Sequence, residues 1–330
     1  MPRFTANPAL SPIARNVCAL VCLITAAPIA AQTYPVKAIR LVVVSAPGGT
    51  TDALARAFSQ RLADKFGQSV VVDNKPGGGG VIAGEIVAHA TPDGYTLLLA
   101  NLSHSLMGTL HANLSFDPMR DFTPVAFMGL TNSVLVTNVN LPVKTVQDII
   151  AYAKTRPGDL NYAGGTTGAT AHLSGELFKL MTGVSITHVP YKGTASAITA
   201  VIGGEAQMAF LSLPPCVPLI QSGRLRGVAI GSAKRSAALP DLPTVAESGL
   251  PGFDVSAWNG ILAPRGAPRS IVMRLNHEFN RVSDNPEVKV KALAQGTDLE
   301  SETPEQFGAF LAAQTAKWTK VAKAAGMRGD

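Results

Sequence analysis

Short runs of aliphatic and β-branched residues alternate with segments of helical periodicity from residue 34 onward. In the first helical segment, Leu54, Phe58 and Leu62 recur at every fourth position, which predicts one buried stripe, and Gly67 ends the helix. A second helix is expected at residues 81–89. The apolar runs around these helices predict three strands, at residues 39–44, 69–72 and 96–100. Strands and helices that alternate in this way are typical of α/β domains with a mainly parallel sheet.

A second block with the same alternation follows. Thr145 and Asp148 have the spacing of a capping box and predict a helix start, and Gly183 ends the helix expected at residues 170–182. Further helices are predicted at residues 194–201 and 214–222, and strands at residues 133–139, 161–163, 186–189, 208–210 and 228–230. The chain therefore contains two α/β blocks in succession.

The C-terminal segment, from residue 255 on, adds one strand and three helices. Pro268, Pro286 and Pro304 stand near the first turns of those helices, where proline is favoured. One strand is too few for a separate sheet, so we expect this segment to return to the first block. The prediction is a two-lobed α/β protein with two chain crossings between the lobes. Lobe one comprises residues 32–130 and 254–330, and lobe two comprises residues 131–253.

A short repeat marks one turn in each lobe. Gly48-Gly49-Thr50-Thr51 follows the first strand of lobe one, and Gly164-Gly165-Thr166-Thr167 follows an early strand of lobe two. Each turn leads into a helix, and ligands of open α/β sheets bind where helix N-termini present unpaired N–H groups. The two turns are therefore expected to face one another across a cleft. A chance match of two ordinary glycine-rich turns stays open, because four residues are few in a chain with 31 Gly.

The first 31 residues have the pattern of a secretory signal peptide. Arg3 and Arg15 precede an apolar run at residues 17–31 that ends in small residues. This run is shorter than the roughly 20 residues that a membrane helix needs. Val17 and Val21 stand where a lipoprotein signal requires a small residue. We therefore expect an exported, periplasmic protein without a lipid anchor, and no later segment predicts a membrane span.

Composition and charge narrow the functional class. Hydrophobic residues make up 46% of the chain and charged residues 15%, which excludes an intrinsically disordered protein. Without Arg3 and Arg15 the exported chain has 26 basic and 22 acidic residues, and a net charge near +4 is not the footprint of nucleic-acid binding. Only Cys216 remains after the leader, so we expect no internal disulfide. We expect a monomer.

The sequence contains no complete catalytic or cofactor motif. Gly78, Gly80 and Ala83 fit the G-x-G-x-x-A pattern, but Asn101 stands where the dinucleotide motif needs an acidic residue. A P-loop, a G-x-S-x-G elbow and a zincin H-E-x-x-H are all missing from the sequence, so we predict no metal site, no cofactor and no enzymatic activity. Cys216 has no neighbouring charge to form a thiolate and is expected to be a small buried hydrophobe.

Short neutral hydrogen-bonding groups are plentiful near the two turns. An anion held there would rely on helix N-termini, each worth about 0.3 to 2 kcal/mol, whereas micromolar affinity needs about 8 kcal/mol. Several charge-assisted hydrogen bonds of about 1.5 to 3 kcal/mol each must supply the difference. A small carboxylate shared between both lobes meets that requirement. The groups expected to bind it are the hydroxyls of Thr50, Thr51, Ser103, Thr166, Thr167 and Thr170 and the N–H groups of Gly49 and Gly168. His172 fits a pocket lining or a local hydrogen bond equally well.

Several short motifs occur along the chain in the order found in one protein family. They include Ala46-Pro47-Gly48-Gly49-Thr50-Thr51-Asp52, Asn74-Lys75-Pro76-Gly77-Gly78-Gly79-Gly80, Pro92-Asp93-Gly94-Tyr95-Thr96-Leu97, His188-Val189-Pro190-Tyr191-Lys192-Gly193 and Leu239-Pro240-Asp241-Leu242-Pro243-Thr244. With these motifs the chain after the leader resembles, over essentially its whole length, the Bug family of periplasmic solute-binding proteins. These are receptors associated with tripartite tricarboxylate transporters. Each motif is weak alone, and their order and number make the resemblance specific.

The resemblance implies a type II-like periplasmic binding protein that closes on a small ligand, commonly a carboxylate, in the manner of a Venus flytrap. In this family the turns at residues 46–52 and 164–170 contribute ligand contacts, partly through ordered water. The full set of expected ligand-binding residues is Ala46, Gly48, Gly49, Thr50, Thr51, Asp52, Ser103, Gly165, Thr166, Thr167, Gly168, Thr170, His172, Tyr191 and Ser212.

Two positions depart from the family pattern. Gln207 stands where Asp is frequent, and Leu211 stands where a polar residue is frequent, near the expected pocket wall. The ligand class therefore stays open among dicarboxylates, tricarboxylates, amino acids and aromatic acids. The prediction is a non-enzymatic receptor that delivers a small carboxylate to the membrane components of a tripartite transporter. The alternatives are a ligand sensor for a membrane signalling protein and a periplasmic enzyme that uses Asp52, Glu176 and His172.

Overall fold

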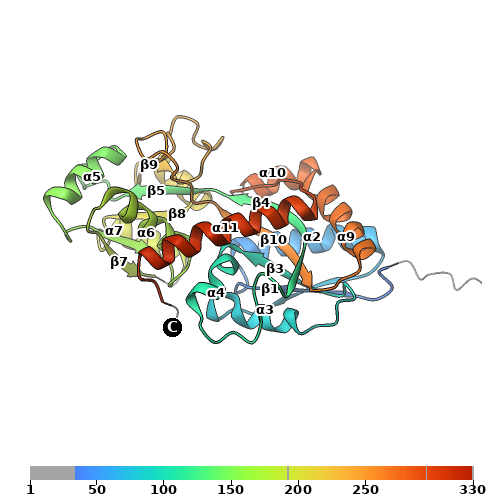
Figure 1. The fold of residues 1–330 in the computed structure, drawn as a ribbon. Coiled ribbons are helices and arrows are strands. Elements are labelled where there is room, and N and C mark those ends of the chain that lie inside the picture. The colour runs from blue at the N-terminus through green and yellow to red at the C-terminus, as the bar shows by residue number, and fades with distance from the viewer. Residues whose placement is uncertain (1–33, 192, 295, 329–330) are drawn as a thin grey trace, which may run out of the picture. The chain divides into compact units, whose positions relative to one another are not determined.

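Two β-sheets, each with helices on both faces, carry the fold from Lys37 onward (Figure 1). The computed structural model describes residues 34–191, 193–294 and 296–328, and the predicted signal peptide at residues 1–31 lies outside them. The first sheet has the strand order β11-β4-β10-β3-β1-β2 and the second has the order β7-β6-β8-β5-β9. The first comprises β1 (Ile39–Val43), β2 (Val70–Asn74), β3 (Thr96–Asn101), β4 (Phe122–Thr131), β10 (Ala257–Pro264) and β11 (Thr297–Asp298). The second comprises β5 (Ser133–Thr137), β6 (Asn161–Gly164), β7 (Thr187–Pro190), β8 (Met208–Ser212) and β9 (Arg226–Ile230).

Both sheets are mixed, and in each of them most strands run in one direction, as expected. In the first sheet β1 pairs in parallel with β2 and β3, but β10 is antiparallel to β3 and β4. In the second, β6 is parallel to β7 and β8, and β5 is antiparallel to β8 and β9. The physical reason lies in the chain path. Because β5 and β10 arrive from the other sheet, they begin at the edge where their neighbours end.

Helices cover both faces of the first sheet. α2 (Thr50–Phe66) packs with α9 (Arg269–Ser283), and Phe58 stacks on Phe279 with ring centroids 6.0 Å apart. The predicted stripe of Leu54, Phe58 and Leu62 is buried, as expected. α3 (Val81–Ala88) and α11 (Pro304–Ala324) join Val42 and other residues of the opposite face in one apolar cluster. α10 (Pro286–Ala294) packs on β11 and α9.

The second sheet also lies between two helical layers. α5 (Val146–Thr155) and α6 (Thr170–Thr182) share an apolar cluster with Tyr162 and Phe210 of the sheet. α7 (Thr194–Gly203) and α8 (Leu213–Gln221) share another cluster with Leu211. The predicted capping box of Thr145 at the start of α5 is present. Cys216 is fully buried in α8, as expected, and this burial raises the pKa of its thiol to about 12.

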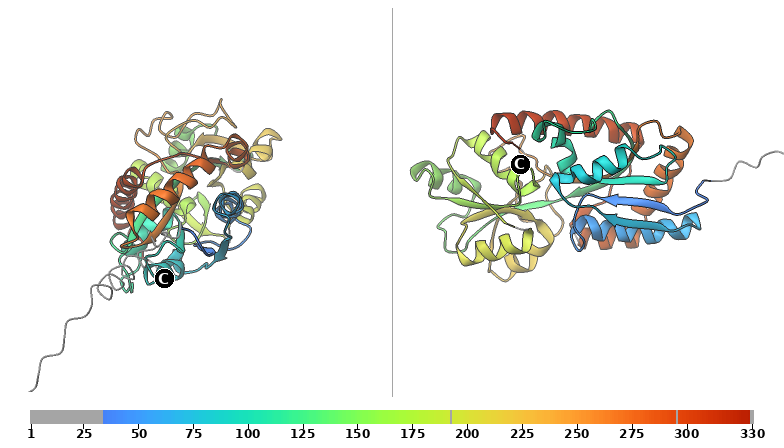
Figure 2. Two further views of the ribbon diagram at one scale, coloured as in Figure 1. Left: turned by 90° about the vertical axis from the view of Figure 1, so that its right-hand side faces the viewer. Right: turned by 90° about the horizontal axis from the view of Figure 1, so that it is seen from below.

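The chain passes between the sheets twice, once from β4 to β5 and once from β9 to β10, as predicted. Ser133 Oγ donates to Val255 O at 3.1 Å, which ties the two crossings together. α11 extends along both sheets and contacts β4 and α6 (Figure 2). Its Lys317 Nζ donates to Asp254 O, on the second crossing, at 2.5 Å. Within the described ranges, no helix has the length and apolar character needed to cross a membrane.

The structure contains several elements that the sequence pattern did not predict. They include β4, the turn η2 (Leu102–Leu106), the short helix α4 (Met107–Leu110) and the two-residue strand β11. β4 contains Pro124 and Gly129, which usually interrupt strands, and its register with β10 shifts twice. Gly129 has φ of +105°, and a side chain at this position would run into the backbone of Asp298. Because Pro124 and Gly129 interrupt the strand pattern, β4 could not be predicted from the local sequence.

Candidate ligand-binding site

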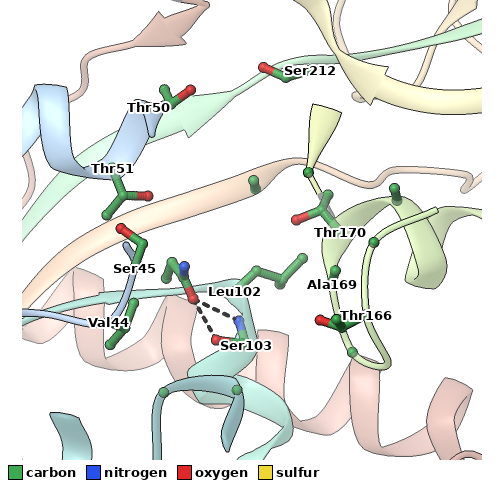
Figure 3. A pocket seen from close by; sticks show the side chains of 18 of the residues that line it. Val44, Ser45, Thr50, Thr51, Leu102, Ser103, Thr166, Ala169, Thr170 and Ser212 are labelled. Atoms are coloured by element: carbon green, nitrogen blue, oxygen red, sulfur yellow. Dashed lines mark hydrogen bonds between the residues drawn. The ribbon is translucent and has the colours of Figure 1, made fainter. Parts of the chain in front are cut away.

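A cavity of about 730 Å³ lies between the two sheets. Its wall is formed where β1, β3, β6 and β8 end and where β5 and β10 begin. Thr50 and Thr51, at the start of α2, lie on one side of the cavity, and Thr166 and Thr170, from the β6–α6 turn, lie on the opposite side (Figure 3). The volume is in the range of small-molecule sites, about 300 to 1,000 Å³. Both glycine-threonine turns therefore contribute to one cavity wall.

Several helices begin at this wall without a side-chain cap, and α2, α6 and α7 are three of them. The N-cap residues of α2, α6 and α7 are Gly49, Ala169 and Gly193, and none of these residues accepts a side-chain cap hydrogen bond. By contrast, α5 and α11 begin away from the cavity with complete capping boxes, at Thr145 and Thr303. An uncapped N-terminus leaves N–H groups available and carries roughly half a positive charge. The ends of three helix dipoles thus meet at the cavity.

Three polar atoms of wall residues are buried without a hydrogen-bond partner in the part of the chain that the structure describes. They are Ser45 Oγ, Ser212 Oγ and the indole Nε1 of Trp258. Leaving a buried polar group unpaired costs about 1 to 3 kcal/mol. Some other wall hydroxyls have protein partners. Thr51 Oγ1 donates to Asn259 Oδ1 at 3.3 Å. Ser103 Oγ donates to Asn101 Oδ1 at 2.6 Å (Figure 3). The three unpaired atoms are therefore candidates for ligand contacts.

The wall is nearly free of ionisable side chains. Among its described residues there is no Lys, Arg, Asp or Glu, and His111 is the one titratable group. Leu211 lies in the wall, as the departure from the family pattern suggested, and Leu102, Met107 and Leu110 add further apolar surface. A search of the described residues for groups of three or more metal-ligating side chains finds none. The site can therefore hold an anion with dipoles and hydroxyls, but not with a guanidinium or ammonium group of these residues.

The structure brings most of the predicted site residues to the wall. Those that line the cavity are Ala46, Thr50, Thr51, Ser103, Gly165, Thr166, Thr167, Gly168, Thr170 and Ser212. Those that do not line it are Gly48, Gly49, Asp52, His172 and Tyr191. The second set lies close to the wall in sequence, but successive residues of a turn or helix point in different directions, so neighbours of wall residues face away.

Asp52 anchors the first turn from behind. Its carboxylate accepts hydrogen bonds from Gly48 N at 2.9 Å, Arg56 Nε at 3.0 Å and Asn74 Nδ2 at 2.9 Å. The hydrogen bond from Arg56 is the main reason that the pKa of Asp52 falls to about 2. Asn74 Nδ2 also donates to Ser45 O at 3.0 Å. Asp52 therefore fixes the turn that presents Thr50, and it does not face the cavity.

His172 and Tyr191 also serve local contacts. His172 Nδ1 accepts a hydrogen bond from Gly168 N at 3.3 Å, and burial lowers the pKa of His172 to about 4. Tyr191 Oη donates to Glu205 Oε2 at 3.3 Å. The buried carboxylate of Glu176 accepts hydrogen bonds from Tyr162 Oη at 2.8 Å and from Lys179 Nζ at 2.9 Å. None of these three groups reaches the cavity wall.

Sequence reasoning missed several wall residues. The glycines at residues 77–80 line the cavity, and all four have positive φ, so their backbone comes close to the ligand space. The glycine run itself was the available signal, although its pattern served only to exclude a dinucleotide site. His111, Trp258 and Asn259 also line the cavity. His111 follows the unpredicted helix α4, and Trp258 and Asn259 lie on β10, which returns from the second sheet. No local sequence pattern indicates that any of them lines a cavity.

Comparison with known proteins matches this architecture to one family. The family model described as "Tripartite tricarboxylate transporter family receptor" (TctC) matches residues 54–327. Protein BugT of Bordetella pertussis is 38% identical over 92% of this chain and 94% of its own length. Among solved structures, R. palustris Rpa4515 with adipate is 39% identical, with a TM-score of 0.80 over 89% of this chain and 99% of that one. MatC from Rhodopseudomonas palustris with bound malate is 32% identical, with a TM-score of 0.76 over 87% and 99% of the two chains. The resemblance to Bug proteins and the two-lobed fold are confirmed, and the chain belongs to the family of tripartite tricarboxylate transporter receptors.

Proposed function

We propose that this receptor captures a small organic carboxylate in the cavity between its two sheets and delivers it to the membrane components of a tripartite transporter. The observation that carries the proposal is the meeting of three uncapped helix starts, those of α2, α6 and α7, at a wall without charged side chains among its described residues. The structural relatives described with adipate and with malate support a carboxylate ligand, since both are dicarboxylates.

The energetics of such a site are sufficient without a cationic side chain. Three helix ends contribute about 1 to 3 kcal/mol together. Three or four charge-assisted hydrogen bonds, from helix N–H groups and from the hydroxyls of Ser45 and Ser212, contribute about 1.5 to 3 kcal/mol each. Their sum reaches the roughly 8 kcal/mol of a micromolar ligand. Contacts from both lobes are needed for this total, so the ligand favours the arrangement in which both turns touch it.

The rest of the cavity favours a hydrocarbon portion in the ligand. Leu102, Met107, Leu110 and Leu211 line it, together with the buried ring of Trp258. We infer an acid with a methylene chain or an aromatic ring, in preference to a densely hydroxylated one. We also propose that lobe one comprises residues 32–130 and 254–330 and that lobe two comprises residues 131–253.

Thermal shift and calorimetry with matched acids and amides test this function. A ligand at 100 times its dissociation constant adds about 2.7 kcal/mol to stability. We expect adipate, benzoate or a related acid to stabilise the protein and the corresponding amides to have no effect. Thr166→Leu and Thr167→Leu should weaken the binding of the acid that stabilises the wild type, with little change in the melting temperature of the free protein. Stabilisation by the amides equal to that by the acids would refute the proposal.

We infer that the protein is not an enzyme. Asp52, Glu176 and His172 are the residues that a hydrolytic or acid–base mechanism would have used. Each is engaged in a local contact away from the cavity wall, which supports a receptor without catalysis. Incubation of the bound acid with the protein should therefore return it unchanged in mass spectra.

Export to the periplasm and action as a monomer belong to the same proposal. The leader at residues 1–31 carries the export signal, so the mass of the protein recovered from the periplasm should correspond to a start at Gln32. Light scattering should give the mass of one chain. A retained leader would refute the proposed cleavage on export, and the mass of a dimer would refute the proposed monomer. Neither result would bear on the proposed binding site.

A further inference from the structure

Two histidines stack directly behind the second glycine-threonine turn. The ring centroids of His172, on α6, and His188, on β7, lie 4.2 Å apart at an interplanar angle of 23°. His172 is buried and His188 is half-buried. Each ring contacts one end of the turn. His188 Nε2 donates to Gly165 O at 3.1 Å, and His172 Nδ1 accepts from Gly168 N at 3.3 Å. The turn between these two contacts forms part of the cavity wall.

These hydrogen bonds fix the tautomer of both rings. A carbonyl oxygen can only accept, so His188 must carry a proton on Nε2. A backbone N–H can only donate, so His172 must be unprotonated on Nδ1 and carry its proton on Nε2, which lies 3.8 Å from Glu176 Oε1. A proton added to His172 would occupy Nδ1 and place two donors against each other. The contact with Gly168 therefore exists only while His172 is neutral.

The surroundings of the pair favour the neutral rings. Burial is the main reason that the pKa of each histidine is lowered; a charge on His188 also lowers the pKa of His172, whereas the hydrogen bond to Gly165 raises that of His188. The charge of Lys179 also lowers the pKa of His172, and that of Glu176 raises it. Glu176 is already engaged with Lys179 and with Tyr162 Oη, and the Tyr162 ring lies 5.0 Å from His188. Glu176, Lys179 and Tyr162 thus surround two neutral imidazole rings.

We propose that His172 and His188 are positioning residues, a stacked neutral pair that clamps the turn of residues 165–168 in the form that binds the ligand. The space around the pair is filled. A Cβ on Gly164 would lie 2.5 Å from His188 Nε2, and one on Gly168 would lie 2.8 Å from Leu110 Cδ1. The turn is held by rings on one side and by α4 on the other. Protonation of His172 removes the acceptor for the Gly168 N–H group and loosens the wall at Thr166 and Thr167, whereas protonation of His188 keeps its Nε2–H donor to Gly165 O.

Substitutions at His172 separate the clamp from a general packing role. His172→Asn places Oδ1 where Nδ1 stands and keeps an acceptor for Gly168 N–H, but it cannot titrate. His172→Phe keeps an aromatic ring for stacking on His188 and loses the acceptor. His277→Asn, at an exposed histidine of α9, is the matched control. We expect the contact with the Gly168 N–H group to persist in His172→Asn and to be lost in His172→Phe.

Nuclear magnetic resonance of the ligand-free protein tests the clamp directly. The Gly168 amide should exchange at least tenfold faster in His172→Phe than in the wild type at pH 7, and at the wild-type rate in His172→Asn and His277→Asn. Its chemical shift should titrate below pH 6.5 in the wild type and in His277→Asn, and should be flat in His172→Asn. Equal exchange in wild type and His172→Phe, or the same titration in His172→Asn as in wild type, would overturn the proposal. If His172→Phe does not fold, the titration comparison decides alone.

The effect on affinity rests on the proposed carboxylate site, and adipate is the probe. At pH 7.5, calorimetry should show at least tenfold weaker adipate binding by His172→Phe and a change of less than threefold in His172→Asn. Unchanged adipate affinity in His172→Phe would overturn the role of the clamp in binding. If the wild type does not bind adipate while the Gly168 amide behaves as expected, the result counts against the proposed ligand and supports the clamp itself.

Discussion

Replacement of Ala169 by aspartate should stabilise the protein and abolish ligand binding at the same time. Ala169 is the N-cap of α6, lines the cavity and has φ of −67° and ψ of 152°, which is the backbone conformation of an N-cap. An aspartate side chain there can accept hydrogen bonds from the N–H groups of Ala171 or His172. It supplies the cap that α6 lacks and places a carboxylate where the proposed ligand carboxylate binds.

The two effects have different magnitudes and opposite signs. A side-chain N-cap is worth about 0.5 to 2 kcal/mol relative to alanine, which raises the melting temperature by about 2 to 4 °C per kcal/mol in a protein near this size. The ligand loses one or two charge-assisted hydrogen bonds, about 1.5 to 3 kcal/mol each. It also meets a like charge, which costs about 4 kcal/mol at 4 Å and an effective dielectric constant of 20. The affinity should therefore fall by at least two orders of magnitude.

Calorimetry for affinity and urea unfolding for stability measure the two effects separately. Ala169→Asn is the control, because it caps α6 without a charge. It should give a similar gain in stability and a loss in affinity of only about tenfold. Full affinity in Ala169→Asp together with the expected gain in stability would show that the N-terminus of α6 does not hold the ligand. A loss of stability would instead refute the assignment of Ala169 as an open cap.

Three further predictions concern the framework of the site. Asp52→Asn should cost about 2 kcal/mol at pH 7, because the pKa of Asp52 is near 2 instead of 3.8, and the wild-type advantage should disappear as the pH falls from about 4 to 2 in urea melts. Burial holds the pKa of His104 at about 4, below its usual 6.5, so the free energy of unfolding should fall as the pH drops from 6.5 toward 4. His104→Gln should recover about 2 kcal/mol of it at pH 4.5. The same pH dependence of stability in the variant and the wild type would contradict this. Gly129→Ala should cost at least about 3 kcal/mol, because it adds a backbone clash to the positive φ, whereas Gly266→Ala, with open space around it, should cost about 1 kcal/mol in thermal melts.

Local sequence patterns were sufficient for most helices and short strands of this fold. The stripe of Leu54 and Phe58 and the capping box at Thr145 each correspond to an observed element. The antiparallel pairing of β5 and β10 was not predictable, because it depends on which sheet the chain arrives from. β4 was missed because Pro124 and Gly129 interrupt its pattern, and tertiary pairing with β10 overrides that local signal.

The site was predictable where it lies on the turns themselves and unpredictable elsewhere. Thr50 and Thr166 belong to a visible repeat that precedes two helices, and both line the cavity. Trp258 comes from a strand about ninety residues after Thr166 in the chain, so no short sequence window contains both residues. Asp52 and His172 were assigned to the wall, but their side chains support the turns from behind. A window of sequence does not reveal which side of a turn faces the ligand.

A wall that relies on helix ends has a consequence for unloading. α2 packs on the first sheet, and α6 and α7 pack on the second, so the electric field at the proposed carboxylate depends on how closely these helix ends approach one another. The field of a helix end falls off within about one turn. For the proposed carboxylate, a movement that draws α2 away from α6 and α7 by a few ångströms would therefore be enough for release, without a proton, a counter-ion or a competing anion.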